Sequence, residues 1–180
     1  MNYDMVASPN YIFMVYDADQ STFPADGVPI PDGSTTIEDV YESYYTMIGV
    51  PYDDTAFDGR SDYQAFIDAD IPSSGLFTGA EVPKTEAQEA IWGGTAGEAF
   101  DPCYHQACDT IDNINMDALD VNSDVIAFAM LTFAYSTESV NGVPGMKVPP
   151  PPHSRMPTPA GPEGTFAEEG GGLHAPRGTF

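Results

Sequence analysis

The chain has 180 residues, of which 42% are hydrophobic and 12% aromatic, enough for the core of one domain. Its 28 acidic residues against five basic ones give a net charge of −23, which argues against nucleic acid or an anionic membrane as a partner. No apolar run approaches the roughly 20 residues of a membrane span, and no basic segment followed by an apolar core marks a signal peptide. The charge fits an acid-tolerant or cation-binding extracellular protein, although a solvated acidic surface alone has the same composition.

Two strand-like runs open the chain. The first, Met1 to Val6, holds Asp4 among apolar neighbours. A carboxylate there is costly to bury unless it is paired or bound to a metal, so Asp4 either binds something or faces solvent at a strand end. The second run, Tyr11 to Tyr16, lies between a Ser-Pro-Asn turn and an aspartate. Residues 23–33 then read as a loop rich in proline and glycine.

A first helix is predicted from Thr35, where Thr35 and Glu38 have the spacing of a capping box and Gly49 supplies the stop. Its apolar residues fall at helical spacing: Ile37, Val40, Tyr41, Tyr44 and Ile48. These side chains are expected to pack into the core.

Arg60 is one of only two basic residues among the first 140, and it lies in the acidic segment 58–62. Charge alone allows two interpretations, a structural ion pair or a cation that orients a substrate. A short helix at 61–68 and a strand at 71–77, weakened by Pro72, follow. Thr85 and Gln88 then form a second capping box for a helix that runs through Trp92.

Both cysteines of the chain lie in the segment 101–109, which we call the clamp. Cys103 and Cys108 enclose Tyr104 and His105, and oxidation would close a small loop with roughly 2 kcal/mol of stabilisation. A closed loop would hold the imidazole and the phenol in fixed directions. The spacing also allows a plain structural staple, a zinc site made of the two thiolates and the imidazole, or a redox pair.

A long helix is predicted from Met116 to about Ser136. Asp120 and Asp124 share one face of it, where they either bind a calcium ion or form a solvated acidic surface. The segments divide the chain into a folded part, 1–138, and a Pro/Gly-rich tail, 139–180, that is predicted to be disordered. Alternating strand-like and helical segments indicate an α/β fold.

Five blocks of this sequence resemble the secreted co-catalytic di-zinc aminopeptidases, the leucine-aminopeptidase-type peptide hydrolases of bacteria and fungi. The resemblance runs in unbroken order from residue 1 to about 137. The blocks are Asn-Tyr-Asp-Met-Val-Ala-Ser-Pro-Asn at 2–10, Asp-Gly-Arg-Ser-Asp at 58–62, Gly-Leu-Phe-Thr-Gly-Ala at 75–80, Trp-Gly-Gly-Thr-Ala-Gly at 92–97 and the clamp.

The resemblance assigns roles to single residues. It implies that Asp4 and His105 are ligands, one to each of two zinc ions. It implies that Tyr104 donates a hydrogen bond to the tetrahedral oxyanion and that Arg60 lies beside the substrate backbone. Phe77 matches a wall of the pocket that takes the apolar N-terminal side chain of a peptide.

The resemblance also covers three secondary features. Cys103 and Cys108 match a disulfide pair. Asp120 and Asp124 match calcium ligands of some bacterial members. Tyr63 departs from the family, which often has histidine there. That position is not a zinc ligand, so we expect the residues around Tyr63 to adjust and no metal to be lost.

Part of the family's metal centre has no counterpart in this chain. A histidine, a bridging aspartate and a glutamate beside the general-base glutamate are expected before Asp4, and zinc takes about four ligands. The resemblance therefore implies the C-terminal half of a mixed-sheet zinc exopeptidase domain with helices on both faces. The missing half would leave a sheet edge and apolar surface exposed.

The implied function is removal of N-terminal, apolar residues from peptides with a free N-terminus, by a secreted enzyme. The 180 residues alone are expected to be inactive, with the N-terminal half as the missing partner. Two alternatives stay open: one chain of a two-part enzyme, and a non-catalytic, acidic, secreted binding protein.

Overall fold

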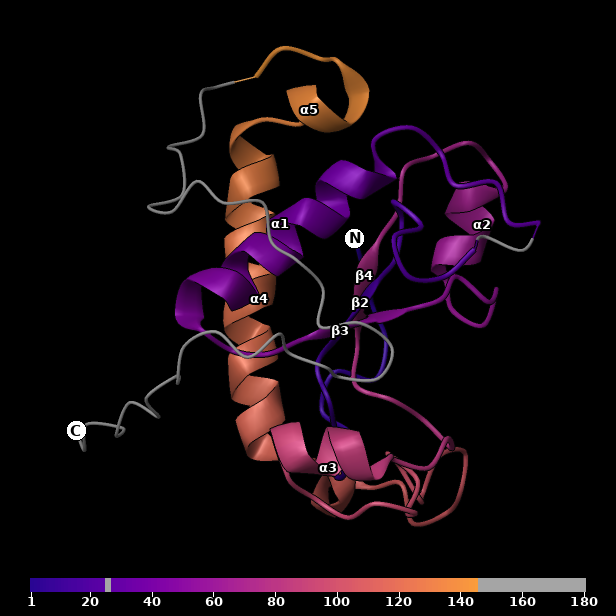
Figure 1. The fold of residues 1–180 in the computed structure, drawn as a ribbon. Coiled ribbons are helices and arrows are strands. Elements are labelled where there is room, and N and C mark those ends of the chain that lie inside the picture. Colours follow the sequence, from indigo (N-terminus) through magenta and orange to yellow (C-terminus); the bar gives the residue numbers. More distant parts are fainter. Residues whose placement is uncertain (25–26, 146–180) are drawn as a thin grey trace.

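The computed structural model describes residues 1–24 and 27–145 and has a four-stranded mixed sheet at its centre (Figure 1). The strands are β1 (Asn2–Tyr3), β2 (Met14–Tyr16), β3 (Asp53–Thr55) and β4 (Gly75–Phe77), in the spatial order β1-β4-β2-β3. β1 pairs with β4 and β2 with β3 in parallel, whereas β2 and β4 run antiparallel. The predicted α/β class is confirmed.

The two faces of the sheet bury different parts of the chain. Side chains alternate along a strand, so Phe13 and Val15 point to one face and Met14 and Tyr16 to the other. The first face is covered by α1 (Ser34–Ile48) and by α4 (Met116–Tyr135). The second face carries α2 (Tyr63–Ile67), which lies on the side of the sheet away from α4 (Figure 1). Helices therefore cover both faces, as expected.

The second predicted capping box is confirmed and the first is wrong. Thr85 caps α3 (Glu86–Trp92), and the reciprocal hydrogen bonds with Gln88 are both present. The helix α1 instead begins at Ser34, after Gly33, without a side-chain cap. Glu38 accepts hydrogen bonds from the loop after β2, at the amides of Ala18 and Asp19, because tertiary partners take the carboxylate that the local pattern had assigned to the helix end.

The strand β3 was not predicted, because two aspartates hide its β character. The strand forms by pairing with β2, in which Asp53 and Asp54 align with Met14 and Val15. Both carboxylates are buried. Side-chain packing against a central strand has overridden the low β propensity of aspartate.

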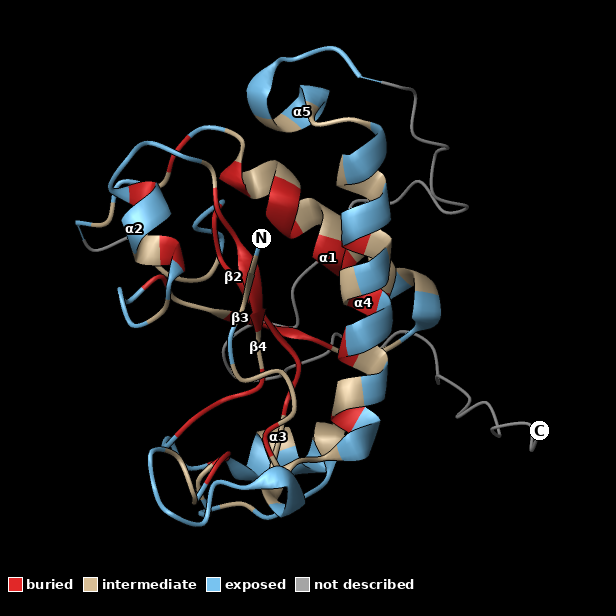
Figure 2. Cartoon of the chain, turned by 180° about the vertical axis from the view of Figure 1, so that it is seen from behind, coloured by how far each residue is buried: buried red, intermediate tan, exposed pale blue. Residues whose placement is uncertain are grey.

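The long helix α4 forms as predicted, and its buried stripe packs on α1. The opposite side of α4 is exposed (Figure 2) and includes Met130 and Leu131. Among the described residues, α4 is also the one helix long and apolar enough to cross a membrane by length and composition, with a mean hydropathy of 1.2. Much of the apolar surface of this helix is therefore not covered by other described residues.

Helical structure continues past the predicted end of the folded part. The short helix α5 spans Glu138–Asn141 and packs against α1. A 3-10 helix, Ile111–Asn113, precedes α4. Most of the predicted tail, residues 146–180, lies outside the described residues.

Candidate active site

A pocket of about 370 Å³ opens beside the strands β4 and β2. Four residues predicted for the site line it: Asp4, Arg60, Phe77 and Tyr104. The fifth, His105, stacks its imidazole on the Tyr104 ring, with the ring centres 4.0 Å apart and the planes at 23°. The fold therefore brings together residues that are as many as 101 positions apart in the sequence.

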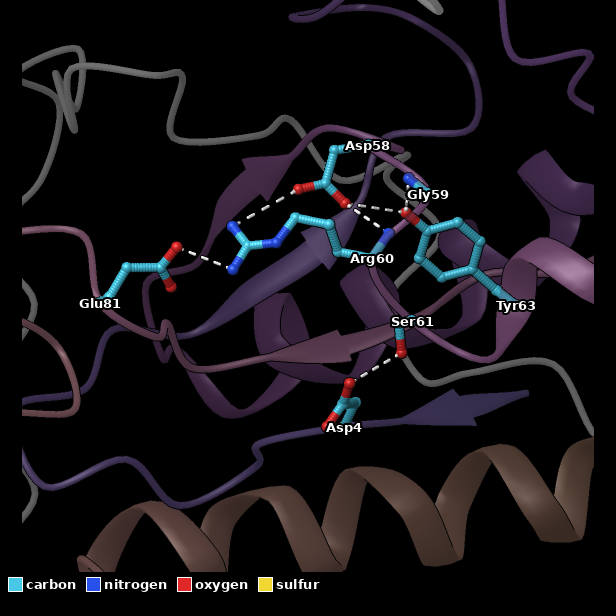
Figure 3. A network of polar contacts seen from close by, with 7 residues as sticks. All are labelled: Asp4, Asp58, Gly59, Arg60, Ser61, Tyr63 and Glu81. Carbon is cyan, nitrogen blue, oxygen red and sulfur yellow. Dashed lines mark hydrogen bonds and ion pairs between the residues drawn. The ribbon is translucent and has the colours of Figure 1, made fainter. Parts of the chain in front are cut away.

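Asp4 follows β1 and presents an exposed carboxylate to this pocket. Its Oδ2 accepts a hydrogen bond of 2.9 Å from the Ser61 hydroxyl (Figure 3). The Ser61 hydroxyl in turn accepts a hydrogen bond of 2.8 Å from the Asn2 side-chain amide. This relay fixes one oxygen of Asp4. Asp4 thus faces solvent beyond the end of a strand, and its other oxygen, Oδ1, accepts no hydrogen bond from the described residues.

Arg60 lies between two carboxylates (Figure 3). Its guanidinium donates to Glu81 over 2.7 Å and lies 4.0 Å from Asp58. Contacts with the Tyr104 phenol and then with Glu81 raise the pKa of Arg60. Arg60 thus forms an ion pair with Glu81, the first of the two interpretations that its charge allows. Since about half of the Arg60 side chain remains exposed, it is also free to meet a ligand in the pocket.

Tyr63 is fully buried and holds the turn that carries Arg60. Its phenol donates to Asp58 and accepts from the Gly59 amide, at 3.1 and 2.7 Å (Figure 3). The ring packs edge-on against Phe57 and Tyr16. Tyr63 therefore supports the site from behind and does not enter it.

The clamp contains a disulfide between Cys103 and Cys108. Asp101 anchors its start, since its buried carboxylate accepts from the Cys103 amide and from the Asn113 side chain, each at 2.9 Å. Within the loop, His105 has a positive φ of 55°, an uncommon conformation for a residue other than glycine. The closed loop projects the imidazole and the phenol side by side.

Apolar side chains form the floor of the pocket. Phe77 lies there with Met14 and Phe100, and its role as a wall for an apolar group stays a prediction. Gly79 allows this arrangement: its φ is +94°, and an added Cβ would lie 2.2 Å from the Phe100 ring. A larger residue at position 79 would displace Phe100 from the floor.

A zinc ion fits the donors present here only in part. Carboxylate and imidazole are normal zinc ligands, and Asp4 and His105 supply one of each at the pocket. Among the described residues, however, the groups of three or more candidate ligands within 4.8 Å of one another share Glu38 and include neither Asp4 nor His105. A zinc site at this pocket would need further ligands beyond Asp4 or His105.

Asp120 and Asp124 lie one turn apart on the exposed side of α4. No third carboxylate of the described residues completes a ligand group with them. The calcium site implied for this pair stays a prediction.

Three contributors to the site were missed in the sequence. Ser61 orients Asp4, and Glu81 holds Arg60. The buried Asp53 also lines the pocket, and burial raises its pKa to about 7 although the Asp54 amide lowers it. Ser61 lies within the quoted 58–62 block, which was the available signal; nothing in the sequence distinguishes Glu81 or Asp53 among the many acidic residues.

Comparison with known proteins gives a consistent result. The profile of peptidase family M28 matches residues 1–130. The chain is 51% identical to the probable leucine aminopeptidase 2 of Aspergillus fumigatus, over 78% of this chain and 27% of that protein. It is 49% identical to the probable lipoprotein aminopeptidase LpqL of Mycobacterium tuberculosis, over 81% of this chain and 30% of that one. The chain thus spans less than a third of the length of these curated relatives.

Proposed function

The chain belongs to peptidase family M28, and we propose that it is the C-terminal part of the catalytic domain of a zinc aminopeptidase. The observation that carries the proposal is the convergence of Asp4, Arg60, Phe77 and Tyr104 on one pocket, with His105 stacked on Tyr104. Relatives named as aminopeptidases match over most of this chain. The substrate is a peptide with a free N-terminus.

Two zinc ions are the cofactors, one held by Asp4 and one by His105, together with ligands from the rest of the domain. Zinc supplies Lewis acidity, which polarises the first peptide carbonyl and makes water a better nucleophile. Ser61 holds Asp4 in the direction that a ligand needs, because it donates to one carboxylate oxygen and leaves the other available.

The other residues of the pocket bind and orient the peptide. The Tyr104 phenol donates a hydrogen bond to the oxyanion that develops at the carbonyl, a contact that strengthens in the transition state. Arg60 binds the substrate backbone and is kept extended by Glu81. Phe77 packs against the N-terminal side chain, so we propose a preference for apolar first residues.

The described chain does not complete this chemistry alone. Each zinc ion would retain one protein ligand of the roughly four it needs, and the glutamate that the resemblance implies as the general base has no counterpart in this chain. We therefore propose that the 180 residues by themselves do not hydrolyse peptides. By family resemblance the whole protein is secreted.

A chimera tests the proposal. Residues 1–140 of this chain replace the matching segment of the Aspergillus fumigatus relative, and hydrolysis of leucine p-nitroanilide is measured. We expect the chimera to turn over and the isolated chain to be inactive. Loss of activity in Tyr104→Phe with retention in Glu86→Gln, an exposed control on α3, supports the assigned roles. A folded, zinc-loaded chimera without activity, or an active isolated chain, would contradict them.

A further inference from the structure

Three carboxylates that take no part in the hydrogen bonds of Asp4 and Arg60 meet between α1 and β3. We call them the acidic triad. Glu38 and Glu42 lie one turn apart on α1, and Asp54 lies on β3. Asp54 pairs in register with Val15, whose side chain faces α1. One ligand atom from each carboxylate lies within 4.8 Å of the other two. All three residues are 4% exposed or less.

Each member of the acidic triad has an oxygen without a partner. Glu38 uses Oε2 to accept from the amides of Ala18 and Asp19, and Asp54 uses Oδ2 to accept from the Thr22 hydroxyl. Glu38 Oε1, Glu42 Oε1 and Asp54 Oδ1 are buried and accept no hydrogen bond in the part of the chain that the structure describes. Three buried acceptors left unpaired at one place are uncommon in a folded protein and call for a ligand.

No basic side chain of the described residues offsets this charge. The two available, Arg60 and Lys84, are engaged elsewhere, with Glu81 and with backbone carbonyls. Burial, followed by repulsion from neighbouring carboxylates, raises the pKa of Glu38 to about 8 and that of Glu42 to about 9. The acidic triad therefore needs either protons or a cation to be stable.

We propose that Glu38, Glu42 and Asp54 bind a hard divalent cation of the calcium type, which joins α1 to β3. Carboxylate oxygens are the ligands that such ions prefer, and the site offers neither sulfur nor imidazole for a softer metal. A second group, Asp17, Asp19 and Glu38, shares Glu38 with the triad. Asp19 is exposed, so this side gives the ion a route from solvent.

The bound ion would also brace one edge of the pocket. Asp17 already organises the following turn, because its carboxylate accepts from the amides of Ser21, Thr22 and Phe23. Phe23 and Asp54 both line the pocket. The ion would thus couple the fold around α1 to the pocket wall. This inference does not rest on the proposed aminopeptidase activity.

The test is a calcium titration of the full chain, freed of metal with a chelator and held at about pH 7.5, followed by isothermal titration calorimetry and thermal unfolding. MgCl₂ and ZnCl₂ serve as competing probes. Three variants accompany the wild type: Glu42→Gln removes one ligand, Glu86→Gln removes a distant exposed carboxylate, and Asp120→Asn/Asp124→Asn removes the pair on α4. Asp54→Asn is a second ligand variant in case Glu42→Gln does not fold.

We expect calcium at about 100 times its dissociation constant to raise the thermal midpoint by roughly 5 to 10 °C. The dissociation constant should rise at least about tenfold in Glu42→Gln or Asp54→Asn and stay unchanged in the two control variants. Without metal, Glu42→Gln should melt above the wild type, because the buried Glu42 carboxyl must take up a proton on folding at this pH and glutamine need not. The proposal is overturned if no divalent ion shifts the wild type, if zinc binds the triad better than calcium, or if the α4 variant alone abolishes binding.

Discussion

The Arg60 guanidinium donates a 2.7 Å hydrogen bond to Glu81 at the rim of the pocket that Asp4, Phe77 and Tyr104 also line. Both side chains are about half exposed. A pair at such a position adds little to folding. Its effect is to hold an otherwise flexible cation extended toward the pocket, which is where a peptide backbone would lie in the proposed reaction.

Arg60→Met should therefore impair catalysis without affecting stability. In the active chimera we expect kcat/KM for leucine p-nitroanilide to fall by about tenfold to 100-fold, chiefly through a higher KM, since a substrate contact is lost. The free energy of unfolding should change by less than about 0.5 kcal/mol. Glu81→Gln keeps the guanidinium but releases it, so a smaller loss is expected. Unchanged kinetics in Arg60→Met would exclude the substrate-binding role.

Lys84 differs from the exposed Arg60, because its ammonium group is buried and has a structural role. Its Nζ donates to the carbonyls of Tyr11 and Gly93, each at 2.8 Å, and so ties the segment before β2 to the end of α3. Lys84→Met would leave both acceptors without their donor, and the free energy of unfolding should fall by about 2 to 4 kcal/mol. Urea denaturation measures this, with the exposed Arg60→Met as the matched control. Equal stability of the two variants would contradict the assignment.

The same lysine should give a pH signature. Burial lowers the pKa of Lys84 to about 8 from its ordinary 10.5, opposed by Glu89, while the Tyr11 ring lies 5.9 Å from the ammonium. The native state thus releases the proton more readily than the unfolded chain. The free energy of unfolding of the wild type, minus that of Lys84→Met, should be constant below about pH 8 and rise as the pH increases toward 10.5.

Denaturation at several values from about pH 7 to about pH 9.5 checks this difference. Buried carboxyls and tyrosines titrate alike in the two proteins, so their effects cancel in the subtraction. A difference that stays flat or falls over the window would show that Lys84 keeps its proton in the native state.

Asn122 lies on α4 in the larger core and joins it to α1 and to the segment after β1. It is fully buried, accepts a 2.5 Å hydrogen bond from the Tyr45 phenol and donates one of 2.7 Å to the Val6 carbonyl. Asn122→Ala leaves both partners unpaired and opens a cavity, so we expect a loss of about 2 to 4 kcal/mol in the free energy of unfolding. Ser123→Ala, the exposed neighbour on α4, should change it by less than about 0.5 kcal/mol. Similar effects of the two substitutions would refute the structural role of Asn122.

Local patterns predicted the helices of this fold well. The helical spacing of apolar residues from Ile37 to Ile48 and the glycine stop identified α1, and the Thr85 capping box identified the start of α3. The strand β3 and the true partners of Glu38 were not predictable locally. Both depend on a neighbour distant in sequence, β2 for the strand and the loop after β2 for the carboxylate.

The residues of the site likewise fall into two groups, those identified from the sequence and those identified from the structure. Asp4, Arg60, Phe77, Tyr104 and His105 were identified because they fall within blocks that resemble one family, and the pocket gathers the first four. The contacts of Ser61 with Asp4 and of Glu81 with Arg60, and the grouping of the acidic triad, come from the structure. In a chain with 28 acidic residues, burial and the lack of a partner, and not residue type, distinguish the carboxylates that need a ligand.

The most direct test of the central claim, that Asp4 and His105 each hold one zinc ion, is the zinc content of the purified chimera. We predict about two zinc ions per molecule in the wild type, consistent with one protein site for each ion. Asp4→Asn and His105→Gln should each lose about one ion and lower kcat/KM by roughly 100-fold or more, while Glu86→Gln retains both ions. Full zinc content and activity in Asp4→Asn and His105→Gln would contradict the account.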